Sequence, residues 1–333
     1  MMKSMDEILE QARDWIDEGR MVAFATVIST WGSSPRPVGS QIVVNDNGAF
    51  AGSVSGGCIE TFVVSEALDV IDTGQSLILE YGVTDEQARE VRLVCGGTIR
   101  LFVELAPDRA AIDRLIADQP IARVVNLRTG ESSLVDEERA EGSLALDAST
   151  LIKARYFATS DSSDMIYVGL DSFFVRTYAP SRKIVIIGAV HITQSLAPMA
   201  LTAGFSVTVI DPRPLFSKDD RFPDIELNRQ HPERVFPDYP LDARTAVVTL
   251  AHDPVLDDPA LKAALTSPAY YIGALGSRKS HAKRLSRMQT AGFSHKTLAR
   301  IHGPVGLDIG GRSPAHIALS ILAQIVATGN GKN

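Results

Sequence analysis

The hydrophobic and polar positions of residues 1–178 predict short strands mixed with helices. Apolar runs bounded by polar turns predict strands at 22–29, 41–45, 76–81 and 98–105. A capping box at Ser4 and Glu7 predicts the start of a first helix. A second helix is predicted by an apolar stripe at Ile59, Val63, Ala67 and Val70. Residues 107–178 mix a short helix with strands, and we expect them to complete a first domain.

After the polar break Ala179-Pro180-Ser181-Arg182, the pattern changes to strand, helix, strand at the spacing of a parallel α/β sheet. Near-continuous apolar runs predict strands buried on both faces at 183–187, 207–210, 245–250 and 270–272. A basic helix is predicted at 278–291, and Ser313-Pro314 begins a last helix. The fold class is therefore α/β, with an N-terminal mixed α+β domain over 1–179 and a Rossmann-like parallel-sheet domain over 183–330.

Composition narrows the class of protein. A length of 333 residues suggests two domains, and the chain has no apolar run near the ~20 residues that span a bilayer. The N-terminus lacks the apolar core of a signal peptide, so we expect a cytoplasmic protein with no membrane association. A net charge of −7 argues against a nucleic-acid partner. Two cysteines cannot form a disulfide framework, so their importance would lie in reactivity.

The segment GAVHIT at 188–193 follows a predicted strand where a dinucleotide-binding loop would lie. Of the glycines in G-x-G-x-x-G only Gly188 is present, because Val190 and Thr193 occupy the other two positions. Asp211 comes 23 residues after Gly188, near the spacing of an acid that binds the ribose. If Val190 must adopt a positive φ, the strain is about 1–3 kcal/mol, which argues against NAD(P) or FAD in the usual pose. The segment is either an anion or mononucleotide site that uses free N–H groups and His191, or a tight turn that needs Gly188.

Two loops of the first domain place a cysteine beside two glycines. GSVSGGCIE at 52–60 contains Gly56, Gly57 and Cys58, and VCGGTI at 94–99 contains Cys95, Gly96 and Gly97. A cysteine at the start of a helix would have its thiolate favoured by the helix dipole, which suggests a reactive Cys58. The alternative is that each cysteine is a small buried hydrophobe in a tight turn.

Polar residues of the second domain follow the predicted strands, where open α/β sheets bind ligands. They are Asp211, Arg213, His252, Gly276, Ser277, Arg278 and Asp308. Ser277 and Arg278 begin the basic helix and would suit an anion. The alternatives are that the basic run is a solvated helix face and that His252 is an ordinary structural histidine.

Taken in order, the motifs resemble the XdhC/CoxI family, the accessory proteins of the xanthine dehydrogenase family of molybdenum enzymes. The segments that carry the resemblance are GSSPRPVGS, GSVSGGCIE, VCGGTI, VIIGAVH, VIDPRP, HDPVLDDPAL, YIGALGSRKSHAKRL and GPVGLDIGGRSP. The resemblance implies a first domain of the XdhC/CoxI type that handles the molybdenum cofactor, as molybdopterin or its dinucleotide form. It also implies delivery to an apo molybdenum hydroxylase after a terminal sulfur is installed, with a cysteine desulfurase as a second partner. Cys58 and Cys95 match the family's cysteine motifs and are expected to lie near the molybdenum.

The chain departs from the family pattern at three places. Val190 replaces the second glycine of GAGH, Ala315-His316 stands where an acidic pair often occurs, and Gln324 replaces an acid. We therefore predict a cofactor-binding chaperone without turnover of its own and without catalytic residues, which forms a homodimer. Two alternatives stay open: an NAD(P)- or FAD-dependent oxidoreductase that uses the Rossmann-like domain, and a scaffold that docks the target enzyme without touching the cofactor.

Overall fold

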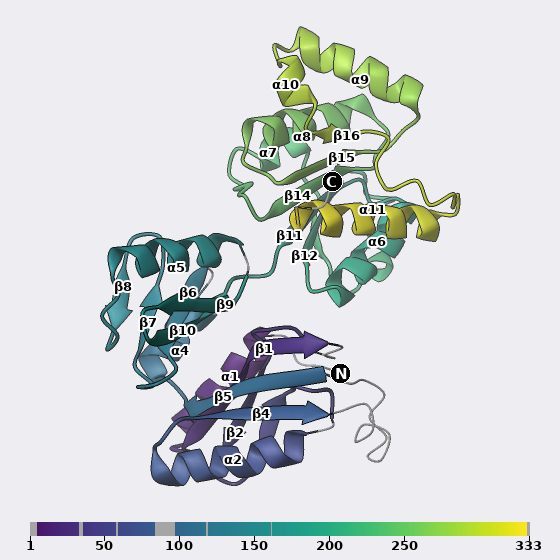
Figure 1. Ribbon diagram of the computed structural model, residues 1–333. Coiled ribbons are helices and arrows are strands. Elements are labelled where there is room, and N and C mark those ends of the chain that lie inside the picture. The colour runs from purple at the N-terminus through teal and green to yellow at the C-terminus, as the bar shows by residue number, and fades with distance from the viewer. Residues whose placement is uncertain are drawn as a thin grey trace. The chain divides into compact units, whose positions relative to one another are not determined.

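The structure is a computed structural model that describes residues 5–32, 36–57, 59–83, 97–117, 119–160 and 162–331. The chain divides into two compact units, Met1–Pro180 and Ser181–Asn333 (Figure 1). The division lies inside the polar segment at 179–182. Among the described residues, none of the helices is both long and apolar enough to cross a membrane.

Sheet A of the first unit has the strand order β3-β2-β1-β5-β4, with antiparallel neighbours throughout. Its strands are β1 (Val22–Gly32), β2 (Gln41–Asn45), β3 (Phe50–Gly52), β4 (Leu77–Val83) and β5 (Gly97–Leu105). Helices α1 (Met5–Asp17) and α2 (Glu60–Thr73) cover its two faces. Along β1, Val22 and Phe24 pack toward α1, whereas Ala23, Ala25 and Val27 pack toward α2. The period of two in β1 therefore builds a core on each side of the sheet.

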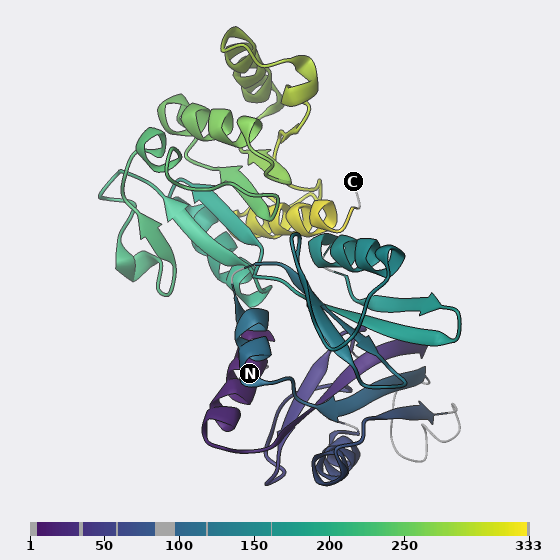
Figure 2. The same cartoon turned by 90° about the vertical axis from the view of Figure 1, so that its left-hand side faces the viewer.

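Residues after β5 form a second antiparallel sheet, sheet B, which the sequence pattern had not resolved into its strands. Its order is β8-β7-β6-β10-β9. The elements are α4 (Arg109–Ile116), β6 (Ile121–Asn126), β7 (Ser132–Val135), β8 (Ala140–Gly142), α5 (Ala148–Ser160), β9 (Asp164–Val168) and β10 (Asp171–Tyr178). Helix α5 packs against sheet B, as α2 does against sheet A (Figure 1, Figure 2).

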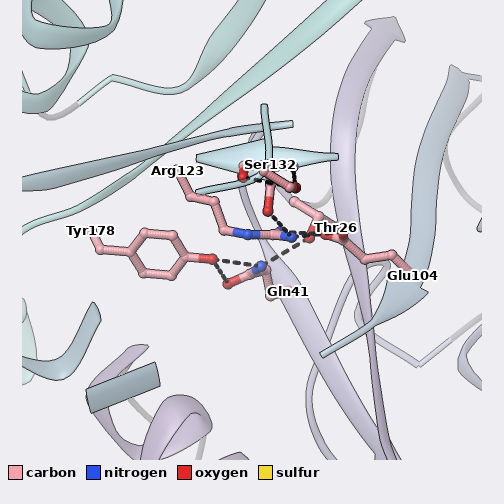
Figure 3. Close-up of polar contacts among 7 residues, drawn as sticks. Thr26, Gln41, Glu104, Arg123, Ser132 and Tyr178 are labelled. Atoms are coloured by element: carbon pink, nitrogen blue, oxygen red, sulfur yellow. Dashed lines mark hydrogen bonds and ion pairs between the residues drawn. The ribbon is translucent and has the colours of Figure 1, made fainter. Parts of the chain in front are cut away.

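Buried polar side chains join sheet A to sheet B (Figure 3). Arg123 of β6 donates to both carboxylate oxygens of Glu104 of β5, at 2.5 and 2.8 Å, and to Ser132 at 3.0 Å. Gln41 of β2 donates to the hydroxyl oxygen of Tyr178 of β10 at 3.0 Å. Because these contacts bury charge and polarity between the sheets, they fix how the two sheets meet.

The second unit is built on sheet C, a parallel sheet in the order β13-β12-β11-β14-β15-β16. Its strands are β11 (Lys183–Ile187), β12 (Ser206–Ile210), β13 (Glu226–Asn228), β14 (Thr245–Thr249), β15 (Tyr271–Ala274) and β16 (Ile301–His302). The helical segments are α6 (His191–Thr202), η1 (Asp219–Arg221), α7 (Pro232–Val235), α8 (Pro254–Thr266), α9 (Arg278–Thr290), α10 (His295–Leu298) and α11 (Pro314–Gly329). Helices α6 and α11 contribute to the core on one face, and α8 and α9 to the core on the other. The predicted Rossmann-like domain is confirmed.

The predicted strand at 41–45 has the observed bounds, and the one at 22–29 continues to Gly32. The predicted start of the last helix is confirmed, since Ser313 is the N-cap and accepts a hydrogen bond from the His316 N–H. Helix α8 was not predicted because its sequence contains two prolines. Pro254 occupies the first turn, where its missing N–H costs nothing, and Pro259 lies inside the helix.

Candidate functional site

The ends of three strands define one end of sheet A, which we call the cysteine end. Gly32, the last residue of β1, is paired with Gly97, the first residue of β5. Gly97 is also paired with Val83, the last residue of β4. The chain therefore leaves β4 at Val83 and enters β5 at Gly97 at this end, with the segment 84–96 between them in sequence. Cys95 and Gly96 belong to that segment and lie outside the described residues.

The other cysteine segment leaves the sheet in the same direction. Strand β3 is parallel in direction to β1, because each is antiparallel to β2 between them. It ends at Gly52, whose Cβ position lies 2.4 Å from the Gln41 carbonyl oxygen, so a larger residue would not fit. The loop Ser53–Gly57 follows and leads to Cys58, which lies outside the described residues. The topology thus directs both cysteine segments toward the cysteine end, while contact between the thiols stays a prediction.

The amide groups of the loop Ser53–Gly57 are bound by the side chain of Glu60. The carboxylate accepts hydrogen bonds from the backbone N–H groups of Val54, Ser55, Gly56 and Gly57 and from the hydroxyls of Ser53 and Ser55. Burial by itself would raise the pKa of Glu60, but the hydrogen bonds from the two serines and the backbone lower it to about 2. The N–H groups of Gly56 and Gly57 therefore already donate to the Glu60 carboxylate of the same chain.

In the second unit, the predicted site residues follow the carboxyl ends of parallel strands of sheet C. They are Gly188 and His191 after β11, Asp211 and Arg213 after β12, His252 after β14, Gly276, Ser277 and Arg278 after β15, and Asp308 after β16. The strand order reverses between β11 and β14, which is the point where open α/β sheets bind ligands. His252 has a φ of 59°, which is uncommon for a residue other than glycine.

The loop after β11 is not strained at Val190, so the positive φ considered for that position is wrong. Val190 is the N-cap of α6, with φ −91° and ψ 178°, an ordinary extended conformation. Gly188 has a φ of 106°, and a Cβ there would lie 2.6 Å from the backbone nitrogen of Ala251. The glycine is therefore required by its close approach to the chain leaving β14.

Asp211 is fully buried, and both of its carboxylate oxygens accept hydrogen bonds. Its carboxylate accepts from the Ala189 N–H at 2.7 Å and from the Arg213 guanidinium at 2.9 and 2.7 Å. Burial would raise the pKa of Asp211, but hydrogen bonds from Arg213 and Ala189 lower it. Arg213 also lies over the ring of Phe216, with its guanidinium carbon 4.3 Å from the centroid. A ribose that bound this acid would have to displace Arg213.

The start of α9 exposes positive charge. Gly276 has a φ of 141°, and the Ser277 hydroxyl accepts from the Ser280 N–H at 3.1 Å as the N-cap. Arg278 and Lys279 are exposed in the first turn, and His191 and Asp308 are likewise exposed. Among the residues that the structure describes, no group of three or more His, Cys, Asp and Glu side chains is arranged to hold a metal ion.

Two family models match the sequence: the XdhC and CoxI family over residues 15–82 and the XdhC Rossmann domain over residues 184–325. The chain belongs to the XdhC and CoxI family. It is 27% identical to the molybdenum cofactor insertion chaperone PaoD of Escherichia coli, over 96% of this chain and 87% of that protein. It is 24% identical to a protein of Bacillus subtilis named as a probable xanthine dehydrogenase subunit, over 94% of each. A crystal structure of a xanthine dehydrogenase from Bacillus halodurans has 25% identity and a TM-score of 0.77, covering 99% of this chain and 97% of that one.

This XdhC-family chain also contains buried polar groups that sequence reasoning missed. Near the carboxyl ends of β14 and β15, Thr249 Oγ1, Asp257 Oδ1 and Arg284 Nε are buried, and the described residues offer them no hydrogen-bond partner. Burial raises the pKa of Asp257 to about 7, against the opposing effect of the Arg284 charge. The acidic pair Asp257-Asp258 was visible in the sequence. Only the formation of helix α8 shows that Asp257 is buried.

A polar pocket of about 540 Å³ lies at the other end of sheet A from the cysteine end. It is lined by Gly74, Gln75, Ser76, Glu104, Leu105, Ala106, Pro107, Arg123, Arg128, Thr129, Gly130 and Ser132. Its two arginines are paired, Arg123 with Glu104 and Arg128 with Asp171. The pocket therefore offers hydroxyl and backbone groups rather than unpaired positive charge.

Proposed function

We propose that this chain binds the molybdenum cofactor as its cargo, holds it while a terminal sulfur is installed, and inserts it into an enzyme of the xanthine dehydrogenase family. The Escherichia coli relative that is named a molybdenum cofactor insertion chaperone matches 96% of the chain, so the likeness includes both units. The Bacillus relatives are named for xanthine dehydrogenase. These names support a maturation role, and sulfuration by a cysteine desulfurase is the finer part of the proposal.

The single geometric observation behind the proposal is the register at the cysteine end of sheet A. Gly32, Val83 and Gly97 are paired there, and β3 runs toward the same end. Two cysteines that are far apart in sequence thus lie next in sequence to strands that run along one direction of the sheet: β3, which ends level with Ala25 of β1, and the β4–β5 pair, which meets at the cysteine end. Thiolates are soft ligands. We propose that Cys58 and Cys95 contact the metal end of the cofactor.

The cofactor also has an anionic end, a phosphate or a nucleotide diphosphate, which needs donors. The loop Ser53–Gly57 does not supply them, because its amides are bound by Glu60. The second unit has an exposed helix start with Arg278 and Lys279, and a helix N-terminus combined with basic side chains suits an anion. We propose that Gly276, Ser277 and Arg278 form an anion-binding site of the second unit, with His191 and His252 as further donors and Asp308 as an acceptor for other groups of the cofactor at the same sheet edge.

The alternative function, a nucleotide-dependent oxidoreductase, meets a specific obstacle. Its ribose would need the carboxylate of Asp211, which is buried and holds both Ala189 and Arg213. Gly188 is likewise required by the backbone of Ala251 rather than by a pyrophosphate. These contacts favour the chaperone over a protein that binds NAD(P) or FAD in the usual pose.

Native mass spectrometry of the protein purified from a bacterium that makes the cofactor tests the proposal. We expect an adduct of pterin mass that is absent when the host cannot make molybdopterin, and that decreases in the double variant Cys58→Ser, Cys95→Ser. Protein that is bare in both hosts, or that carries a flavin or nicotinamide, would contradict the proposal. The same spectra report the oligomeric state, for which we propose a homodimer, and fractionation tests the proposed cytoplasmic location.

Transfer is the second half of the test. Adduct-bearing protein is mixed with an apo enzyme of the xanthine dehydrogenase family, and the recovered hydroxylase activity is measured. We expect activity from the loaded protein and none from protein made in the molybdopterin-deficient host. If the loaded protein restores no activity, the insertion step is wrong even where binding holds.

A further inference from the structure

The loop Ser53–Gly57 is held partly by its own residues, since the Gly56 N–H donates to Ser53 Oγ at 2.9 Å. Gly56 and Gly57 have φ values of 85° and 115°, which glycine adopts without steric cost but also leaves easily in an isolated chain. The loop turns away from the sheet after Ser53, whose N–H donates to Gln41. The buried N–H groups of Val54 and Ser55 need acceptors from outside the loop, because a buried N–H without a partner is costly, and the exposed Gly57 also donates outside the loop.

Glu60 supplies those acceptors, and its two carboxylate oxygens bind different parts of the loop. Oε1 accepts from Ser53 Oγ at 2.7 Å and from the N–H groups of Val54, Ser55 and Gly56 at 3.2, 3.0 and 3.1 Å. Oε2 accepts from Ser55 Oγ at 2.6 Å and from the Gly57 N–H at 2.9 Å. Oε1 thus holds the body of the loop, and Oε2 holds the residue that directly precedes Cys58.

Glu60 itself is held in place by the helix that it begins. It is the first residue of α2, where the helix dipole favours a negative charge, and it is only 6% exposed. One turn further on, Val63 is buried in the core between α2 and sheet A, followed by Ala67 and Val70. The carboxylate therefore has a fixed position relative to the sheet, and the loop adapts to it.

We propose that Glu60 is a positioning residue, which through Oε2 and the Gly57 N–H fixes the position of Gly57, the last described residue before Cys58. Its link to the cofactor rests on the proposed function, whereas the ordering of Gly57 does not. The role of the loop is accordingly to position the residue before the cysteine rather than to bind an anionic ligand. Among the residues that the structure describes, no atom lies within 4 Å of a Cβ added at Gly57.

The substitution Glu60→Gln separates the two roles of the carboxylate. The amide oxygen of glutamine can replace Oε1 and keep the body of the loop, but its NH2 group then faces the Gly57 N–H, and two donors cannot bond. Ser55 can turn its hydroxyl to accept, whereas the Gly57 amide has no such freedom. Loss of one hydrogen bond to a charged group should raise the opening of Gly57 about tenfold.

The first test measures amide hydrogen exchange of the full chain by NMR. In Glu60→Gln we expect exchange at Gly57 to become about tenfold faster, with a smaller change at Val54. The matched control is Glu104→Gln, the same substitution at a buried acid near the other end of sheet A, which should leave Gly57 unchanged. Equal exchange of Gly57 in wild type and Glu60→Gln overturns the proposal. If Glu60→Gln does not fold, Glu60→Asp, whose carboxylate is one methylene shorter and cannot reach all of these donors from the same backbone position, should speed exchange at Gly57, and no change at Gly57 overturns the proposal.

The second test measures the fraction of protein that carries the pterin adduct. We expect Glu60→Gln to retain severalfold less adduct than wild type and Glu104→Gln to retain it, although Glu104→Gln is the less stable variant. If Glu60 had only a structural role, the fraction of protein that retains the adduct would instead fall in proportion to the loss of stability of each variant. Equal retention in wild type and Glu60→Gln overturns the link to the cofactor. Bare wild-type protein refutes the proposed function, and the exchange experiment then decides the positioning role by itself.

Discussion

The buried ion pair between Arg123 and Glu104 predicts a large and specific loss of stability when it is broken. The two side chains are 6% and 7% exposed, and the guanidinium makes two hydrogen bonds to the carboxylate. Glutamine at position 104 keeps one acceptor but removes the countercharge, so Arg123 stays buried and unpaired. We expect Glu104→Gln to lower the free energy of unfolding of the first unit by about 3–5 kcal/mol.

A matched substitution at an exposed ion pair gives the loss of unfolding free energy with which the buried pair is compared. Arg128 and Asp171 form an ion pair whose side chains are 69% and 35% exposed. Asp171→Asn should therefore cost less than about 1 kcal/mol. The double variant Arg123→Met, Glu104→Gln should be more stable than Glu104→Gln alone, because no unpaired charge then remains buried.

Urea unfolding followed by tryptophan fluorescence measures these changes in the intact chain. The sequence has two tryptophans, Trp15 and Trp31, and both belong to the first unit. Trp15 packs against the core around α1 and so reports that unit without signal from the second. A loss below about 1 kcal/mol in Glu104→Gln, or equal losses in Glu104→Gln and Asp171→Asn, would refute the reasoning.

Two further predictions concern the second unit. Calorimetry detects the unfolding of this unit as a transition that is not accompanied by a change in tryptophan fluorescence. Gly188→Ala should lower its unfolding free energy by about 3–5 kcal/mol, because a positive φ is combined with a clash against the Ala251 backbone. In the control Gly204→Ala the φ is also positive, but no atom of the described residues lies within 4 Å of the added Cβ, so we expect a cost of only about 1–2 kcal/mol. Equal costs for the two variants would contradict the clash. The pKa of Asp257 is raised to about 7 from 3.8, so the folded state keeps a proton that the unfolded state loses. Wild type should therefore lose stability relative to Asp257→Asn as the pH rises from 4 to 7, and a difference between their melting temperatures that does not grow between pH 4 and pH 8 would refute the shift.

Local patterns predicted those elements whose stability depends on their own residues. The apolar runs of the second domain are near-continuous because parallel strands are buried on both faces, and β11 and its neighbours lie where those runs predicted. Ser313-Pro314 predicted the start of α11 because capping depends only on adjacent residues. Sheet B was less visible, since polar residues such as Arg123 and Ser133 are buried within its strands and β8 has no buried residue, so the apolar pattern is interrupted.

At the candidate site, the sequence identified the loops but not what their polar groups do. It identified Gly56 and Gly57 as a pair of glycines beside Cys58, and both have a positive φ in the structure. It could not tell that Glu60 turns back onto the loop, because a glutamate after two glycines is equally compatible with an exposed side chain. The same holds for Asp211, which has the spacing of a ribose-binding acid but bonds to Ala189 and Arg213.

The sequence by itself determined the α/β class, the family and the loops in which chemistry can occur, because each depends on residue types close together in the chain. Tertiary structure alone decided which carboxylates accept hydrogen bonds from within the chain, and that β3 and β4 run in the same direction in sheet A. The physical reason is that hydrogen-bond acceptors are shared across distant segments. The partner of a buried carboxylate or amide is therefore chosen by packing and strand register rather than by its neighbours in sequence.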